Sequence, residues 1–123
     1  MSEQALQTIV VSVGSQGGTV NRGLFRVPSS DSSFGGITIT KAYIQAGGAA
    51  TSVLQLQNLG TALGTAVSSV IGTLNATLVA NVRQAFSITT PYQASGTWLG
   101  LGTGAGGSLD AATNVIIEYH WGK

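Results

Sequence analysis

The chain has 123 residues, of which 43% are hydrophobic and 7% are charged, with a net charge of +1 and no cysteine. This length fits a single domain. The low charge excludes a polyelectrolyte tail, and the hydrophobic content argues against a disordered chain. The five cations are scattered along the sequence, so we expect no nucleic-acid partner, because phosphate binding needs basic residues gathered in a stripe.

The first apolar run, Leu6–Val13, is interrupted by polar residues, and no positively charged segment precedes it. We therefore expect no signal peptide, and we expect the chain to be made in the cytoplasm of its host. No run of 18 apolar residues occurs, so we expect no membrane partner.

Alternation of apolar and polar residues is the main secondary-structure signal at the start of the chain. In the segment Gln7–Val13 it places Ile9, Val11 and Val13 on one face, which predicts a first strand. Val20–Val27 predicts a second strand.

A third strand is predicted at Ile37–Ile44, which is rich in β-branched and aromatic residues. Gly47 and Gly48 separate it from the next apolar run, Val53–Gln57. Two strands joined by a short glycine turn typically pair with each other, so we expect a β-hairpin here.

Residues 60–80 carry apolar residues at helical spacing, but most of the residues between them are glycine, serine and threonine. These are poor helix formers, and their summed cost outweighs the spacing signal. We predict a loop, then a strand around Val70–Leu74, with at most one helical turn near Val79–Val82.

Further strands are predicted at Ala85–Thr89 and Gly96–Leu101, followed by a glycine-rich loop at Gly102–Gly107. The last strand has two faces, with Val115, Ile117, Tyr119 and Trp121 alternating with Ile116, Glu118 and His120. About eight short strands predict an all-β, single-domain β-sandwich or jelly roll, with a small closed barrel as the alternative. Within it we assign residues 1–19 to an N-terminal strand or arm and residues 20–123 to the β-sandwich domain.

Two patterns suggest chemistry but lack its structural requirements. Gly102, Gly104 and Gly107 have the spacing of a dinucleotide-binding loop, but too few residues follow for the helix that this motif needs. His120 is the single histidine; no nucleophile elbow accompanies it, and one histidine without cysteine cannot form a usual zinc site. We therefore expect no enzyme activity, cofactor or metal.

Aromatic rings offer flat faces on which sugars stack. Tyr119 and Trp121 share a face with the apolar residues of the last strand, so we assign them to the core. Tyr92 and Trp98 remain as candidates for an exposed contact.

The chain has two lysines and two prolines, the residues that usually protect the edge strands of a sheet from pairing with other chains. We infer that much of its surface is covered by other copies or by another protein, partly through main-chain hydrogen bonds. Aspartate at Ile9 and Val11 should weaken assembly if the first strand is an arm, and loosen the fold if it is ordinary core. The candidate interface residues are Leu6, Ile9, Val11, Arg22, Tyr92 and Trp98.

Four segments, Ile37–Ile44, Leu54–Thr61, Gly96–Leu101 and Val115–Lys123, resemble in style and order a type of small virion protein of tailed bacteriophages. Proteins of this kind are capsid decoration (cement) proteins, head fibres or modules of tail fibres, and they are commonly trimeric β-sandwiches. The resemblance implies a structural protein on the capsid exterior that binds the major capsid protein of the expanded shell as a homotrimer. The alternative is a receptor- or glycan-binding module of a head or tail fibre; the chain lacks the heptads or collagen-like repeat of a fibre shaft, which favours decoration.

Overall fold

The computed structural model describes residues 6–13, 16–17, 21–27, 35–48, 50–61, 67, 69–103, 108–109 and 113–122. These residues form twelve β-strands and no helix. The strands are β1 (Gln7–Ser12), β2 (Gln16–Gly17), β3 (Asn21–Arg26), β4 (Gly36–Gln45), β5 (Ala50–Asn58), β6 (Ser69–Leu78), β7 (Gln84–Ala85), β8 (Ser87–Ile88), β9 (Tyr92–Ala94), β10 (Trp98–Thr103), β11 (Ser108–Leu109) and β12 (Asn114–Trp121).

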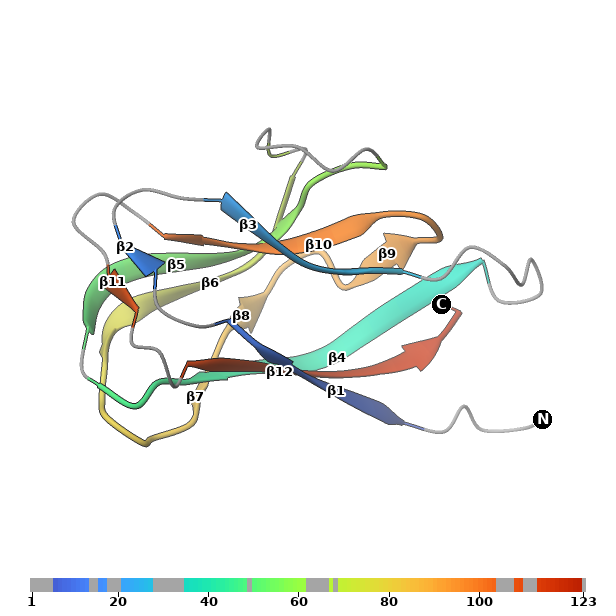
Figure 1. Cartoon of the computed structure of the whole chain (residues 1–123). Helices are drawn as coiled ribbons and strands as arrows, with labels where there is room; N and C mark the ends of the chain where they lie inside the picture. The colour runs from blue at the N-terminus through green and yellow to red at the C-terminus, as the bar shows by residue number, and fades with distance from the viewer. Residues whose placement is uncertain are drawn as a thin grey trace.

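Two five-stranded antiparallel sheets face each other, and β2 and β11 form a small ribbon at one end (Figure 1). The first sheet has the order β1-β12-β4, and both β7 and β9 pair with the far side of β4. The second sheet has the order β3-β10-β5-β6-β8. The predicted all-β, single-domain β-sandwich is thus confirmed.

The space between the sheets is filled by the apolar residues that alternate along the strands, as the sequence predicts for the last strand at Val115 and Ile117. Tyr119 and Trp121 also pack against this core, and their rings meet edge to face with centroids 5.9 Å apart. The buried apolar residues of the core are Val13, Val27, Ile37, Ile39, Ala42, Ile44, Ala46, Leu54, Leu56, Ile71, Leu74, Leu78, Phe86, Leu99, Leu101, Val115 and Ile117.

A β-bulge in β4 changes the phase of this alternation. Ile39 and Ala42 both face the core, although they are three residues apart, because Thr40 and Lys41 are both exposed between them. The register against β12 shifts at this point, and the Thr40 hydroxyl donates to the carbonyl of Glu118 at 3.1 Å. The bulge lets one ten-residue strand keep its apolar side chains inward along its whole length.

The predicted hairpin at Gly47 and Gly48 is wrong. β4 lies in the first sheet and β5 in the second, so this connection crosses from one sheet to the other. The crossing is anchored by Ala46, which is buried and whose carbonyl accepts a hydrogen bond from the Asn81 amide at 2.7 Å. A short glycine connection can join two strands of one sheet or two strands of facing sheets when each strand has one buried face. Here packing between the sheets favours the crossing.

The strand predicted around Val70–Leu74 is confirmed and extends over the whole of β6, which pairs with β5 from Ser69 to Leu78. The segment Val79–Val82 forms a turn in which the Val82 amide donates to the carbonyl of Val79 at 3.2 Å. The loop expected before β6 falls largely on residues 62–66 and 68, outside the described residues, as do residues 104–107 of the glycine-rich loop and the proposed boundary between residues 19 and 20.

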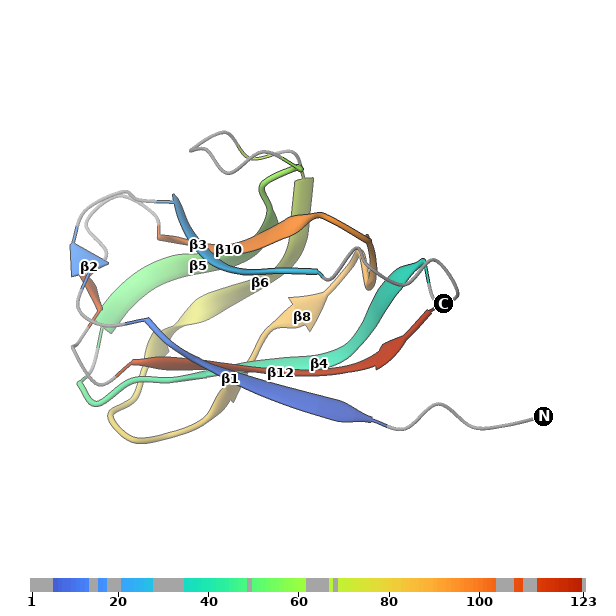
Figure 2. The same ribbon diagram turned by 45° about the vertical axis from the view of Figure 1, so that its right-hand side comes forward.

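The strand predicted at Ala85–Thr89 is divided between the two sheets. β7 pairs with β4 in the first sheet, β8 pairs with β6 in the second, and β9 returns to β4. Phe86, between β7 and β8, donates its amide to the carbonyl of Ala42 at 2.9 Å and buries its side chain in the core. The segment therefore ties the two sheets together along one side of the sandwich (Figure 2).

A chain of side-chain hydrogen bonds joins the sheets near the end of this segment. The Gln93 amide nitrogen donates to the carbonyl of Thr90 at 2.8 Å, and its oxygen accepts from the Asn58 side chain at 2.9 Å. Asn58 in turn accepts from the backbone amide of Gly60 at 2.7 Å. Gln93 is 1% exposed, so these bonds satisfy polar groups that have left water.

Replacing Gln93 by leucine should lower the free energy of unfolding by about 2–4 kcal/mol, because the Thr90 carbonyl and the Asn58 side-chain NH₂ group each lose a partner. Urea denaturation followed by tryptophan fluorescence measures this. Gln45→Leu, at a half-buried position of β4, is the matched control and should change stability by less than about 1 kcal/mol. Equal effects of the two substitutions would show that the hydrogen-bond chain does not connect the sheets energetically.

Candidate interface: the open flank

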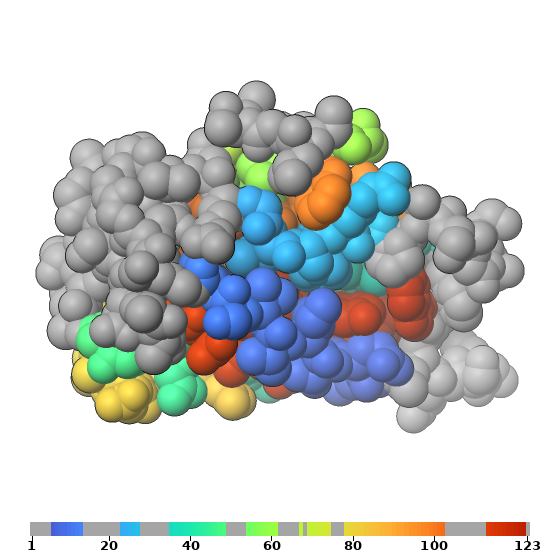
Figure 3. Space-filling model, viewed as in Figure 1, coloured from blue at the N-terminus to red at the C-terminus, as the bar shows by residue number. Residues whose placement is uncertain are grey.

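The sandwich has two unlike flanks. On one side the sheets are tied together by the segment β7–β9; on the other they end in the strands β1 and β3, which lie along the same face of the molecule (Figures 1 and 3). We call the strands β1 and β3 together the open flank. Among the described residues no strand pairs with the outer edge of either.

β1 is a regular edge strand without charge. It pairs with β12 from Gln7 to Ser12 with no shift in register, and its sequence contains no lysine, arginine, acidic residue or proline. Edge strands of monomeric proteins usually carry such residues or a bulge to prevent pairing with another chain. β1 therefore offers an unprotected edge.

The backbone of β1 alternates between its two sides. The Val13 amide donates to the carbonyl of Thr113 at 2.9 Å, toward β12. Since N–H and C=O groups alternate along an antiparallel strand, Val11 and Ile9 also bond toward β12. The N–H and C=O groups of Thr8, Val10 and Ser12 consequently point to the open side.

Apolar side chains accompany this edge. Leu6, just before β1, is 63% exposed, and Val10 is 60% exposed on the outer face of the sheet. Beside Val10 in the register lies Ile116, which is 8% exposed although it faces outward from the core.

β3 differs in character from β1. It carries Arg22 and Arg26, and its pairing with β10 shifts at Leu24, which forms a bulge. Leu24 and Phe25 both pack against the core yet remain partly exposed. Arg26 is exposed and lies opposite Trp98 in the register.

The core is consequently incomplete along the open flank. Ile9 on β1 and Leu24 and Phe25 on β3 are among the apolar residues that the fold buries only in part. Transfer of their remaining surface from water would favour association with another protein surface.

The structure brings together four of the six predicted interface residues. Leu6, Ile9 and Val11 lie on or beside β1, and Arg22 lies on β3 opposite Leu101, although its side chain is outside the described part.

Trp98 lies one strand further in, on β10. Tyr92 is separate from the other predicted residues. It lies on β9, on the far side of β4, where its hydroxyl donates to the carbonyl of Gly35 at 2.6 Å.

Three residues of the open flank were not predicted from the sequence: Val10, Leu24 and Phe25. Val10 could have been found, because the alternation that turns Ile9 inward turns Val10 outward. Leu24 and Phe25 could not, because a bulge places two successive residues against the core.

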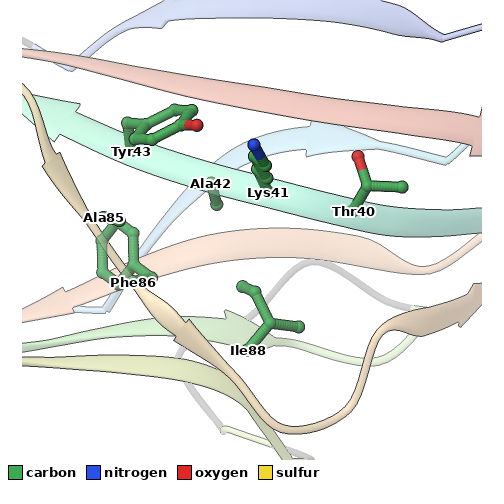
Figure 4. Close-up of a pocket in the computed structure, with 7 residues that line it drawn as sticks. All are labelled: Thr40, Lys41, Ala42, Tyr43, Ala85, Phe86 and Ile88. Carbon is green, nitrogen blue, oxygen red and sulfur yellow. The ribbon is translucent and has the colours of Figure 1, made fainter.

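A pocket of about 500 Å³ lies at the edge of the first sheet that is remote from the open flank. It is next to the stretch of β4 between the residues that pair with β7 and those that pair with β9. Thr40, Lys41 and Tyr43 lie on one side of β4, while Ala42 lies on the other, toward Phe86 (Figure 4). The walls of the pocket are mainly apolar, and Lys41 is its one charged lining residue. The lining residues are Thr40, Lys41, Ala42, Tyr43, Ala85, Phe86 and Ile88.

Comparison with protein-family models, with curated proteins and with solved structures finds no match. Within the described ranges, no three histidine, aspartate or glutamate side chains gather in a way that would hold a metal ion. A search of the same residues finds no helix with the length and apolar character to cross a membrane.

The two faces of β1 should respond differently to charge. Ile9→Asp places a carboxylate against the core and should lower the free energy of unfolding by about 3 kcal/mol. Val10→Asp, one residue away on the exposed face, should change it by less than about 1 kcal/mol. Urea titrations at protein concentrations low enough to keep the chain monomeric separate folding from association. Equal losses would mean that Val10 contributes to the fold rather than to an outer surface.

Proposed function

We propose that the chain is a decoration protein of a tailed-bacteriophage capsid, which binds the exterior of the expanded shell as a homotrimer. The observation that carries this proposal is the open flank. It combines an uncharged, regular edge strand with core residues that the fold leaves partly exposed, as in Ile9 and Phe25. A protein that binds by area burial and main-chain hydrogen bonds needs such surfaces and no reacting group.

The arrangement of the flank also supports a trimer. Each copy in a three-fold ring contributes two different, complementary patches, whereas a two-fold dimer uses the same patch twice. The open flank supplies two unlike edges, β1 without charge and β3 with two arginines. A trimer also multiplies attachment, because three weak contacts with the shell act together.

The alternative glycan-binding role has less support. It depends on Tyr92 and Trp98 as exposed stacking residues, but these lie on strands of different sheets. The Tyr92 hydroxyl is engaged by the carbonyl of Gly35. Four of the predicted interface residues, in contrast, lie together at the open flank.

Co-sedimentation with purified shells tests the proposal. The wild-type chain should bind expanded shells and leave unexpanded shells unbound. Val10→Lys should weaken binding by at least about tenfold, because monomers lose the gain from three linked contacts. Val79→Lys is the matched control, since Val79 is 52% exposed and lies outside the flank. Absence of wild-type binding to either shell, together with saturable binding to a glycan array, would replace decoration by the fibre role.

A further inference from the structure

The two strands of the open flank run in opposite directions. β1 and β3 lie side by side on one face, and the chain passes along them in opposite senses in both views (Figures 1 and 2). Rotation about an axis parallel to these strands preserves the direction of each. β1 of one copy would therefore meet β3 of the next copy in antiparallel orientation.

Charge distinguishes the possible pairings. A contact of β3 with β3 would pair two strands that each carry Arg22 and Arg26, and like charges opposite each other across a strand pair are destabilising. A contact of β1 with β1 has no such cost, but it leaves Leu24 and Phe25 of β3 uncovered. Only pairing between the two strands places the arginines opposite an uncharged strand.

Pairing of β1 with β3 also brings together the partly exposed core residues of the open flank. Ile9 from one copy and Leu24 and Phe25 from the next would lie along the same contact. The outward N–H and C=O groups of Thr8, Val10 and Ser12 would bond to the neighbouring chain. Repeated three times, this contact closes a ring and leaves no strand of the flank unpaired.

We propose that a second copy of this chain occupies the open flank, with β1 of each copy hydrogen-bonded to β3 of the next around a three-fold axis. This inference depends on the trimer of the proposed function, and it assigns the surface through which that trimer forms.

Introducing a positive or a negative charge at Val10 tests the pairing of β1 with β3. Val10 is 60% exposed, so either charge is accommodated by the monomer, and in the trimer it would lie near the exposed Arg26 of the neighbouring β3. Val10→Lys should dissociate the trimer, whereas Val10→Glu should retain it. Sedimentation equilibrium at low salt should show association at least about tenfold tighter for glutamate than for lysine, and a smaller difference at about 1 M salt.

Each result has a definite meaning. Equal weakening by the two charges would overturn the proposal in favour of two-fold pairing of β1, since either charge would then face its own copy. No effect of either charge on a wild-type trimer would place the interface elsewhere, and a wild-type monomer would remove the contact altogether. Val79→Lys and Val79→Glu, at a similarly exposed valine, should leave the oligomer unchanged.

Cross-linking gives a second readout, because the chain has no cysteine. The double variant Val10→Cys/Arg26→Cys, treated with a short bis-maleimide, should give covalent trimers, whereas Val10→Cys alone should remain monomeric on a denaturing gel. Covalent dimers from Val10→Cys alone would contradict the ring. Shell binding is measured separately, so a chain that binds expanded shells without forming these cross-links would retain the proposed function and lose only this inference.

Discussion

The structure depends on one constraint: the backbone N–H and C=O groups along the outer edges of its sheets need hydrogen-bond partners. Every open sheet has two edge strands, and their outward N–H and C=O groups must bond to water or to another chain. The two five-stranded sheets that the described residues form have four edges between them. At one flank, the segment β7–β9 serves both sheets in turn, so the edges there are short and interrupted. At the other, β1 retains six consecutive residues without a bulge, a proline or a charge.

The sequence predicts the layers of the fold better than their connections. Alternation identifies Val115 and Ile117 as core, and it would do so for any partner strand, because burial of one face is all that it reports. It cannot report which sheet a strand joins. The turn at Gly47 and Gly48 therefore reads as a hairpin, while the buried Ala46 carries the chain across to the opposite sheet.

The candidate site shows the same division between local and non-local information. The exposed side of β1 follows from the local pattern around Val10, since neighbouring residues face the core. Its position beside β3 does not, because it results from two sheets ending on the same side of the molecule. Leu24 and Phe25 depend in addition on a bulge that is produced by pairing with β10. The sequence around Leu24 and Phe25 does not by itself predict this bulge.

The few charged residues of the chain are distributed unequally between the two strands of the open flank. In β3, Arg22 and Arg26 disfavour pairing of the strand with its own copy, because such pairing would bring two positively charged strands together. β1 lacks that protection, and it is the strand with exposed Val10 on its outer face. Protection on one edge alone still permits contact between the unlike edges, because an arginine opposite a threonine or serine meets no like charge. The two strands thus differ in the way that a directional assembly which closes into a ring requires. Protection of both edge strands against pairing would favour a monomer. Lack of protection on both would favour uncontrolled association.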